Sequence, residues 1–450
     1  RYKIYSRTTM KKIIFLFLLG WSFSGITAQP ILTEREQSKI VDEILEERFE
    51  KVLPNLMKRT GIDCWLLIAR EYNEDPVLKT MLPSTWLSAR RTTMLLFYLN
   101  PATNIVERYA IARYNVGNAI QAAWDLEKFP DQWDALVDLI QKKNPARIGI
   151  NISKSFGHAD GLDHTHYVQL TEKLPLTYKN KLISAESLAV GWLETRTERE
   201  IQFYQKLVAI THEIIAEGFS ARTITPGITT TDDLVWWFRQ RVTSLGLTTW
   251  FHPSVSVQRS DTVNFEHLRS FSNRPENDVI LPGDLLHVDF GITYLRLNTD
   301  VQQHAYVLRR GETDAPAYLQ KAFNTSNRLQ DILTSQFKTG RTGNEILKEA
   351  RELASKEGIK PSIYSHPLGL HGHAAGPTIG LWDQQQGVFG SGDYPVYPQT
   401  AYSIELNSAT TIQEWGKEIR IMLEEDGYFD GKTFHFLAGR QEKLRLIKYF

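Results

Sequence analysis

The chain has 450 residues, with 52 Lys and Arg against 52 Asp and Glu, 12 His and a single Cys. At about 150 residues per domain, this length predicts two or three domains with a sizeable buried core. The balanced charge argues against a nucleic-acid-binding protein, because neutralising phosphates requires a surplus or a cluster of Lys and Arg. The lone Cys64 excludes an intrachain disulfide and a Cys-x-x-Cys metal site, so any bound metal must use oxygen and nitrogen ligands.

Residues 1–28 have the layout of a secretory signal peptide. Lys11 and Lys12 precede an apolar run over residues 13–19, and a stretch rich in small residues follows and ends at Ala28. The apolar run is shorter than the roughly 18 residues that span a bilayer, which disfavours the alternative of a membrane anchor. We therefore expect a periplasmic or secreted protein with no membrane association after signal cleavage.

The segment over residues 29–193 alternates strand-like and helical patterns. The apolar run Cys64–Ala69 is short enough for a buried strand. The other predicted elements are strands over residues 93–99, 105–112 and 147–150, with a helix over residues 124–142. This alternation predicts an N-terminal α/β domain.

The remaining segment, residues 194–450, reads as an α+β domain. Thr197 and Glu200 have the spacing of a capping box, which predicts that a long amphipathic helix begins there and runs to Phe219. Three more helices are predicted over residues 230–245, 315–338 and 343–357. Strands punctuated by Pro and Gly lie between and after these helices.

Two acids of this second domain fall in strand-like surroundings. Asp289 lies in the middle of an apolar strand, and Asp300 follows in the next strand, where we expect it to face Asp289 across a hairpin. A buried carboxylate is costly unless a positive group pairs with it, and two facing carboxylates repel each other. A divalent cation between them is one explanation. From this pair alone, the alternative that both acids only cap turns stays open.

Histidines concentrate in the same region. Seven of the 12 lie between Phe251 and His373: His252, His267, His287, His304, His366, His371 and His373. The last three fall within eight residues that also contain glycines, which allow close backbone approach. Neutral imidazoles supply nitrogen ligands or proton donors, so this density favours a functional site over isolated core histidines.

Three late acids complete the candidate site. Glu405 lies inside a strand-like run, and Glu424 and Glu425 lie in another. The strand period of two places these neighbouring glutamates on opposite faces. Face parity favours Glu424 as the site residue and leaves Glu425 facing solvent. Four carboxylates and one imidazole suit a hard or borderline divalent ion such as manganese, cobalt or zinc.

The order Asp, Asp, His, Glu, Glu after an N-terminal α/β domain resembles the creatinase/aminopeptidase P/prolidase family, whose catalytic domain has the pita-bread fold. The resemblance is faint over the first domain and clear from about Thr195 onward. It implies five metal ligands: Asp289, Asp300, His366, Glu405 and Glu424. Asp300 and Glu424 would bridge two ions, and His267 and His373 map onto the two histidines that contact substrate.

The resemblance implies a dinuclear hydrolase that removes an N-terminal residue preceding proline, as an aminopeptidase or a dipeptidase. Manganese is the expected ion, with cobalt and zinc as alternatives, and Glu405 would handle the proton. We also expect a peptide substrate with proline at its second position and a homodimer. Two alternatives remain open: a non-catalytic pita-bread binding protein, and a carbon–nitrogen hydrolase that acts on a small non-peptide without metal, as creatinase does.

The sequence departs from the family pattern at several positions that bear on substrate specificity. Leu-Asn follows Glu405 in place of Pro-Gly, Ala374 replaces an acid, and Gln302-Gln303-His304 replaces Thr-Arg-Thr.

A polar cluster around His158 lies in the first domain. We interpret it as a solvated loop and not as a metal site, because no buried apolar strand presents its side chains.

Overall fold

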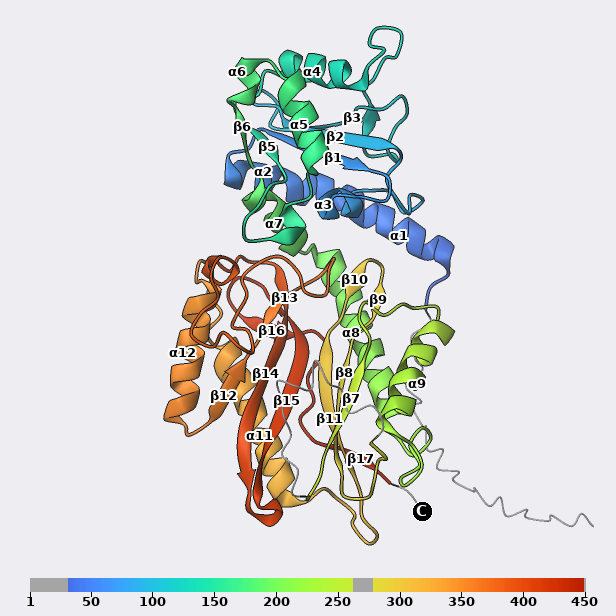
Figure 1. Cartoon of the computed structure of the whole chain (residues 1–450), viewed down its shortest axis with the longest axis vertical. Helices are drawn as coiled ribbons and strands as arrows, with labels where there is room; N and C mark the ends of the chain where they lie inside the picture. Colours follow the sequence, from blue (N-terminus) through green and yellow to red (C-terminus); the bar gives the residue numbers. More distant parts are fainter. Residues whose placement is uncertain (1–30, 262–277, 449–450) are drawn as a thin grey trace, which may run out of the picture.

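Two sheets organise the chain, one in each half of the sequence (Figure 1). The structure, a computed structural model, describes residues 31–261 and 278–448. The predicted signal peptide and His267 lie outside these residues. Among the described residues, none of the helices combines the length and the apolar character that a membrane-spanning segment requires.

The N-terminal domain contains a six-stranded sheet in the order β4-β3-β2-β1-β5-β6. Its strands are β1 (Cys64–Arg70), β2 (Thr92–Leu99), β3 (Val106–Ala110), β4 (Gln121–Ala122), β5 (Ile148–Ile150) and β6 (Leu182–Ser184). Its helices are α1 (Glu34–Glu47), α2 (Leu53–Thr60), α3 (Pro76–Thr80), α4 (Gln132–Lys143), α5 (His164–Lys173), α6 (Leu176–Lys179) and α7 (Glu186–Glu194), with a π-helix, η1 (Arg48–Val52), between α1 and α2.

Both faces of this sheet are covered, which explains why β1 is apolar along its length. Trp65 and Leu67 pack against α1, α2 and α7, whereas Leu66 and Ile68 pack against α4 and α5. The predicted helix over residues 124–142 begins later than expected. Asp131 caps α4 by accepting a hydrogen bond from the Trp133 amide, so the helix starts only at Gln132.

The second domain contains a nine-stranded sheet with the central order β12-β14-β15-β11-β8-β7. The bounds are β7 (Ser254–Gln258), β8 (Leu285–Phe290), β11 (Val301–Val307), β12 (Lys360–Ile363), β13 (His366–Leu368), β14 (Thr400–Ile412), β15 (Lys417–Phe429), β16 (Phe434–Phe436) and β17 (Arg445–Ile447), with a separate hairpin of β9 (Thr293–Tyr294) and β10 (Leu297–Asn298). Strand β13 pairs with β14, β16 with β15 and β17 with β11.

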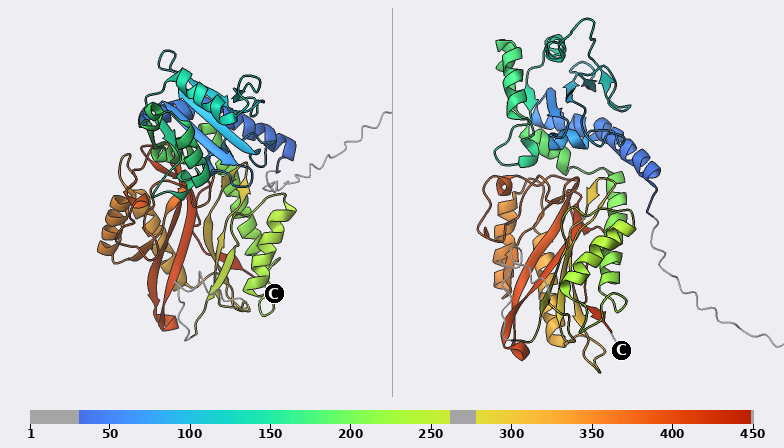
Figure 2. Two further views of the ribbon diagram at one scale, coloured as in Figure 1. Left: turned by 45° about the horizontal axis from the view of Figure 1, so that its top comes forward. Right: turned by 45° about the vertical axis from the view of Figure 1, so that its right-hand side comes forward.

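Two helix pairs flank this sheet (Figure 1, Figure 2). Helices α8 (Glu198–Gly218) and α9 (Thr231–Ser244) pack on the half containing β8 and β11. Helices α11 (Ala317–Thr334) and α12 (Gly343–Lys356) pack on the half containing β14. All four predicted helices are therefore present, within a few residues of their expected ends.

A buried ion cluster joins the two domains at the start of α8. Glu200 lies 2.8 Å from the Nη1 of Arg48 in η1 and 3.0 Å from the Nη1 of Arg196. Burial by itself raises the pKa of Glu200, but the two arginines outweigh it and hold the pKa below its ordinary value. The same carboxylate accepts the Thr197 amide, so the predicted capping box also orders the junction.

Removing this carboxylate should destabilise the protein strongly. Glu200→Ala leaves two buried guanidinium groups uncompensated, and we expect a loss of about 3 kcal/mol or more in the free energy of unfolding. The control is Glu198→Ala, which removes an exposed acid from the same helical turn and should cost less than about 1 kcal/mol. Urea unfolding followed by circular dichroism measures both, and equal losses would contradict the assigned role.

Glu194 is a second buried acid at this junction. Burial raises its pKa to about 8, although Arg59, at 3.9 Å, and the Tyr394 hydroxyl, at 3.3 Å, act in the opposite direction. In the unfolded chain the same group loses its proton near its ordinary value of 4.5. Folding therefore becomes less favourable as the pH rises from about 4.5 to about 8.

Because the raised pKa of Glu194 makes folding less favourable at higher pH, we predict a pH-dependent difference in stability between the protein and its Glu194→Gln variant. Relative to the variant, which cannot ionise at this position, the wild type should lose on the order of 3 kcal/mol of stability between pH 5 and pH 8. Unfolding free energies measured at both pH values test this, with Glu198→Gln as the control. Parallel pH profiles for the wild type and Glu194→Gln would be inconsistent with a protonated Glu194.

Candidate metal centre

A row of polar side chains crosses the middle of the second sheet. Strand pairing places Asp289 of β8 opposite Gln302 of β11, Gln302 opposite Glu424 of β15, and Glu424 opposite Glu405 of β14. Directly opposed residues share a face of the sheet, so all four side chains converge on one side. Asp300 precedes Gln302 by two residues and joins them by the strand period. Gln302, and not Asp300 as predicted, therefore lies directly opposite Asp289, and Asp300 lies diagonal to Asp289.

His366 completes the cluster from the neighbouring strand β13. Its Nε2 lies 3.6 Å from Asp300 Oδ2, 3.6 Å from Glu424 Oε1 and 3.9 Å from Glu405 Oε2. Its Nδ1 lies 3.0 Å from the carbonyl oxygen of Pro367, which can only accept a hydrogen bond. Nδ1 therefore carries the proton, and the lone pair of Nε2 faces three carboxylates.

The arrangement of these donors suits a bound cation. Nε2 of His366 and Oδ1 of Asp300 are both buried, and neither has a hydrogen-bond partner among the residues that the structure describes. Buried polar atoms normally have partners, and a lone pair facing carboxylate oxygens is repulsive without an intervening positive charge. A nitrogen lone pair surrounded by carboxylate oxygens is a ligand set for a divalent metal.

Burial and mutual repulsion change the pKa values of these groups. Burial, followed by repulsion from the neighbouring acids, raises the pKa of Asp300 and of Glu405 well above their ordinary values. Burial likewise raises the pKa of Glu424 to about 7 and lowers the pKa of His366 to about 4. The cluster thus disfavours its charged carboxylates in the absence of a cation, and it keeps the imidazole neutral, as metal binding requires.

The side chains form overlapping groups whose ligand atoms lie within 4.8 Å of one another. One group consists of Asp289, Asp300 and Glu424, and another of His366, Glu405 and Glu424. Glu424 belongs to both, and Asp300 is also grouped with His366 and His373. The structure therefore brings together all five predicted ligands and the predicted histidine His373.

The choice between the two late glutamates follows from their contacts. Glu424 joins the cluster, whereas Glu425 lies on the opposite face, with Oε2 2.6 Å from His212 Nε2 and Oε1 accepting a 2.9 Å bond from Gln303. The expectation that Glu425 faces solvent is wrong, since its side chain is 1 % exposed. Helix α8 covers this face of β15 and supplies a polar partner for the acid.

Sequence reasoning missed the part that Gln302 plays in the cluster. Its Nε2 donates to Glu405 Oε1 at 2.7 Å and to Glu424 Oε2 at 2.6 Å. Its Oε1 lies 2.7 Å from His287 Nε2, which must then carry a proton, and the orientation of the amide is thereby defined. Gln302 thus holds one oxygen of each glutamate and leaves the other oxygen directed toward His366. The sequence did contain one indication of this role, because Gln302 lies two residues after Asp300 and therefore on the same face of the strand.

The other histidines of the region have different roles. His304 is fully buried, with Nδ1 3.0 Å from the Leu286 carbonyl oxygen and Nε2 accepting the Met422 amide at 3.1 Å. These two hydrogen bonds identify it as a core residue that ties β8, β11 and β15 together.

Aromatic rings form the solvent-facing wall beside the cluster. The exposed His373 ring lies 4.7 Å from the His366 ring, 5.2 Å from Trp250 and 5.9 Å from Tyr364, measured between centroids. Tyr364 also interacts electrostatically with the four clustered carboxylates and was not anticipated from the sequence. Apolar rings and an exposed imidazole thus lie together beside the cluster.

Gln302 offers a direct test of how the cluster is held. Gln302→Met preserves the side-chain volume but removes both hydrogen bonds to the glutamates, and we expect the affinity for Mn²⁺ to fall by about tenfold or more. Gln303→Met makes the same change one residue later on the opposite face and should leave this affinity within about threefold. Isothermal titration of metal-stripped protein with Mn²⁺ measures both variants. Equal affinities for wild type and Gln302→Met would refute the assigned role.

Comparisons with known proteins agree with this geometry. The sequence matches metallopeptidase family M24 over residues 202–426, which is half of the chain. A comparison with curated proteins finds no significant match. The fold is similar to that of the X-Pro aminopeptidase from Thermotoga maritima MSB8, with a TM-score of 0.61, 17% identity, and coverage of 87% of this chain and 99% of that chain.

Two further solved structures have the same fold. The Xaa-Pro dipeptidase from Bacillus anthracis has a TM-score of 0.59 and 16% identity, covering 92% of this chain and 100% of the other. The prolidase from Pyrococcus furiosus has a TM-score of 0.54 and 16% identity, covering 86% and 100%. Members of family M24 use divalent metals, and the clustered donors suit them. The chain therefore belongs to metallopeptidase family M24 and is a metallopeptidase with an N-terminal α/β domain and a pita-bread catalytic domain.

Proposed function

We propose that this protein is a dinuclear aminopeptidase that hydrolyses the bond between an N-terminal residue and proline. The observation that carries the proposal is the pair of overlapping ligand groups that share Glu424, one containing Asp289 and the other containing His366. Two such groups would suit two ions, with Asp300 and Glu424 available to both. The names of the similar structures, an X-Pro aminopeptidase, an Xaa-Pro dipeptidase and a prolidase, support proline as the second residue.

The proposed ligand side chains would hold the ions, and one of them, Glu405, would also transfer a proton. Divalent ions bound here would supply Lewis-acid chemistry, because they polarise a carbonyl group and lower the pKa of a nearby water molecule. Glu405 has one oxygen held by Gln302 and the other directed toward His366. That second oxygen, Oε2, is placed to accept the proton of the attacking water and to return it to the leaving proline nitrogen.

Imidazole donors would stabilise the charge that develops on the substrate. His373 lies beside His366 and is exposed, so an N–H of its ring can donate to the carbonyl oxygen as negative charge develops there. Burial lowers the pKa of His373 to about 3, which keeps this donor neutral near pH 7. The resemblance assigns a similar role to His267.

The rival functions have less support. Membership of a metallopeptidase family and the full set of five donors argue against a non-catalytic binding protein. A metal-independent hydrolase of the creatinase type would leave four clustered carboxylates, three of them buried, and a facing imidazole lone pair without a cation. We propose manganese as the natural ion, with cobalt and zinc as alternatives.

The proposal also covers the cellular location, the domain boundaries and the oligomeric state. The layout of residues 1–28 supports export to the periplasm or the outside of the cell. Residues 29–193 and 194–450 are proposed as the N-terminal and catalytic domains, and the family resemblance supports a homodimer.

The central experiment measures peptide hydrolysis after metal replacement. Metal-stripped protein is resupplied with Mn²⁺, Co²⁺ or Zn²⁺ and incubated with Ala-Pro and Ala-Pro-Ala, with Ala-Ala and Ala-Ala-Ala as controls. We expect cleavage that depends on the ion and is specific for the bond before proline. Absence of cleavage with every ion, or equal cleavage of the alanine controls, would overturn the assignment.

A variant of the shared ligand separates metal binding from overall folding. Asp300→Asn is nearly isosteric but should bind metal poorly, so we expect bound Mn²⁺ to fall below one ion per chain and kcat to fall by at least about a hundredfold. Glu418→Gln changes an exposed acid on β15 and should retain both metal and activity. Elemental analysis and peptide assays give the two readouts, and full turnover by Asp300→Asn would contradict the proposed centre.

A further inference from the structure

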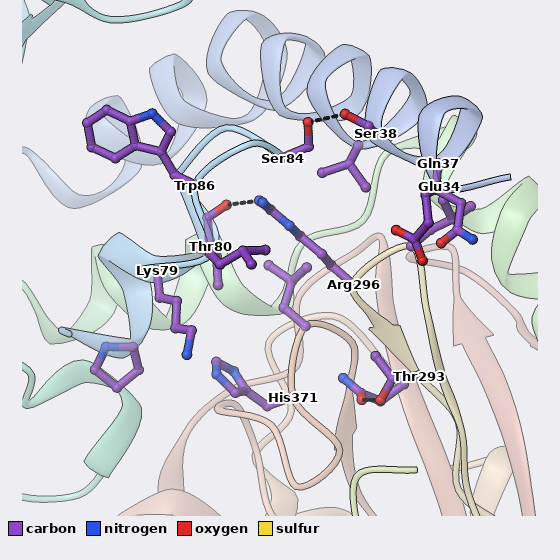
Figure 3. A pocket seen from close by; sticks show the side chains of 16 residues that line it. Glu34, Gln37, Ser38, Lys79, Thr80, Ser84, Trp86, Thr293, Arg296 and His371 are labelled. Carbon is purple, nitrogen blue, oxygen red and sulfur yellow. Dashed lines mark hydrogen bonds between the residues drawn. The ribbon is translucent and has the colours of Figure 1, made fainter. Parts of the chain in front are cut away.

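A cavity of about 520 Å³ lies between the two domains, on the side of the catalytic domain that carries His371. The N-terminal domain contributes α1 and the segment from Pro76 to Leu87, and the catalytic domain contributes the β9–β10 hairpin with Leu370 and His371 (Figure 3). Arg296, in the turn of this hairpin, donates to the Leu82 carbonyl oxygen at 2.8 Å. The cavity is therefore built by both domains together, and a direct hydrogen bond joins its walls.

One end of this cavity gathers basic groups. In Figure 3, the Lys79 ammonium group and the His371 ring point toward the same region, whereas Glu34 lies at the opposite end. Lys79 is exposed, and within residues 31–261 and 278–448 it has no ion-pair partner. Its interaction with Glu74 acts only at longer range. A cation without a close carboxylate is available to bind an anion.

His371 adds a hydrogen-bond donor or acceptor at this end. Its Nδ1 is buried and has no hydrogen-bond partner among the described residues. Burial, followed by the neighbouring basic residues His158, Arg196 and Lys79, lowers the pKa of His371 to about 3. The imidazole is therefore neutral near pH 7, and it can donate a hydrogen bond to a negatively charged ligand from one ring nitrogen.

His158 connects this region to the candidate metal centre. Its ring centroid lies 4.3 Å from that of His371. The predicted solvated loop is exposed at Asp160 and His164, as expected, but His158 itself is half-buried. The loop packs against the catalytic domain, which the sequence could not reveal. His158 also acts on the pKa of His373, whose ring is next to the metal ligand His366. A line of imidazoles thus runs from the metal centre to the cavity.

The spacing of His371 and His373 indicates which part of a bound peptide would reach the cavity. His371 and His373 are two residues apart, so their Cα atoms are separated by at most about 7 Å. An extended peptide rises about 3.3 Å per residue. A peptide whose proline lies beside His373 would therefore bring a residue one or two positions beyond proline to His371, which lines the cavity.

We propose that Lys79, His371 and His158 form a subsite for the C-terminal carboxylate of short peptide substrates, and that this subsite favours tripeptides and tetrapeptides over dipeptides. Lys79 forms the ion pair, and the two imidazoles contribute N–H donors. This inference rests on the proposed function, because it assigns a substrate length to the same active site.

The first experiment measures binding without hydrolysis. Pro-Ala and Pro-Ala-Ala, each with a free C-terminal carboxylate or a C-terminal amide, are titrated into the manganese-loaded enzyme by calorimetry. We expect the free acids to bind about tenfold more tightly than the amides. Lys79→Met should remove this preference, and Lys79→Arg should retain it. Lys348→Met, which changes an exposed lysine of α12, is the matched control and should behave as wild type.

The second experiment measures hydrolysis of Ala-Pro, Ala-Pro-Ala and Ala-Pro-Ala-Ala as acids and as amides. We expect kcat/KM to favour the acid about tenfold for the two longer peptides. In Lys79→Met this advantage should be lost through a higher KM for the acids, with kcat retained. A preference for the dipeptide, or an acid-to-amide ratio unchanged by Lys79→Met, would overturn the subsite.

The two experiments distinguish failure of the subsite from failure of the proposed function. If no peptide is hydrolysed but the acids bind more tightly in a Lys79-dependent way, the subsite stands and the proposed activity is wrong. If proline peptides are cleaved but acids and amides bind equally, the activity stands and the subsite is wrong.

Discussion

Three buried carboxylates and a fourth, half-buried one around one imidazole lone pair impose the main constraint on this structure. Asp289, Asp300, Glu405 and Glu424 would repel one another in a dry sheet, and His366 presents Nε2 to three of them. Burying such groups without a counter-charge costs several kcal/mol, far more than the apolar residues at these positions would. These acids are concentrated at the centre of the sheet, where divalent cations can offset the cost of burying them. The metal centre and the strand register that assembles it are therefore inseparable.

The same register explains how the cluster is held. Gln302 lies between Asp289 and Glu424 in the strand pairing, and its amide binds both glutamates while His287 fixes its orientation. A side chain with one acceptor and two donors is suited to this place, because it links a neutral imidazole to two carboxylates. On the far side of β15, Glu425 is bound by His212 and Gln303 instead. Neighbouring acids on one strand thus serve a catalytic face and a structural face.

The N-terminal domain contributes Lys79 and His158 to the proposed carboxylate subsite. Its link to α8 depends on the buried cluster of Arg48, Arg196 and Glu200, which ties one domain to the other. This link allows Lys79 and His158 to lie beside His371. In our proposal, substrate length therefore depends on both domains, whereas the proposed catalytic groups belong to the catalytic domain.

The sequence by itself determined the elements and the donor set. Periodicity and capping patterns predicted the helices α8, α9, α11 and α12, and strand parity selected Glu424 over Glu425. These features depend on local spacing, which a sequence displays directly. The clamp formed by Gln302 and the contact of His158 with His371 were decided only by tertiary structure. Each depends on partners that are distant in the chain, and no periodic pattern in the sequence records such partners.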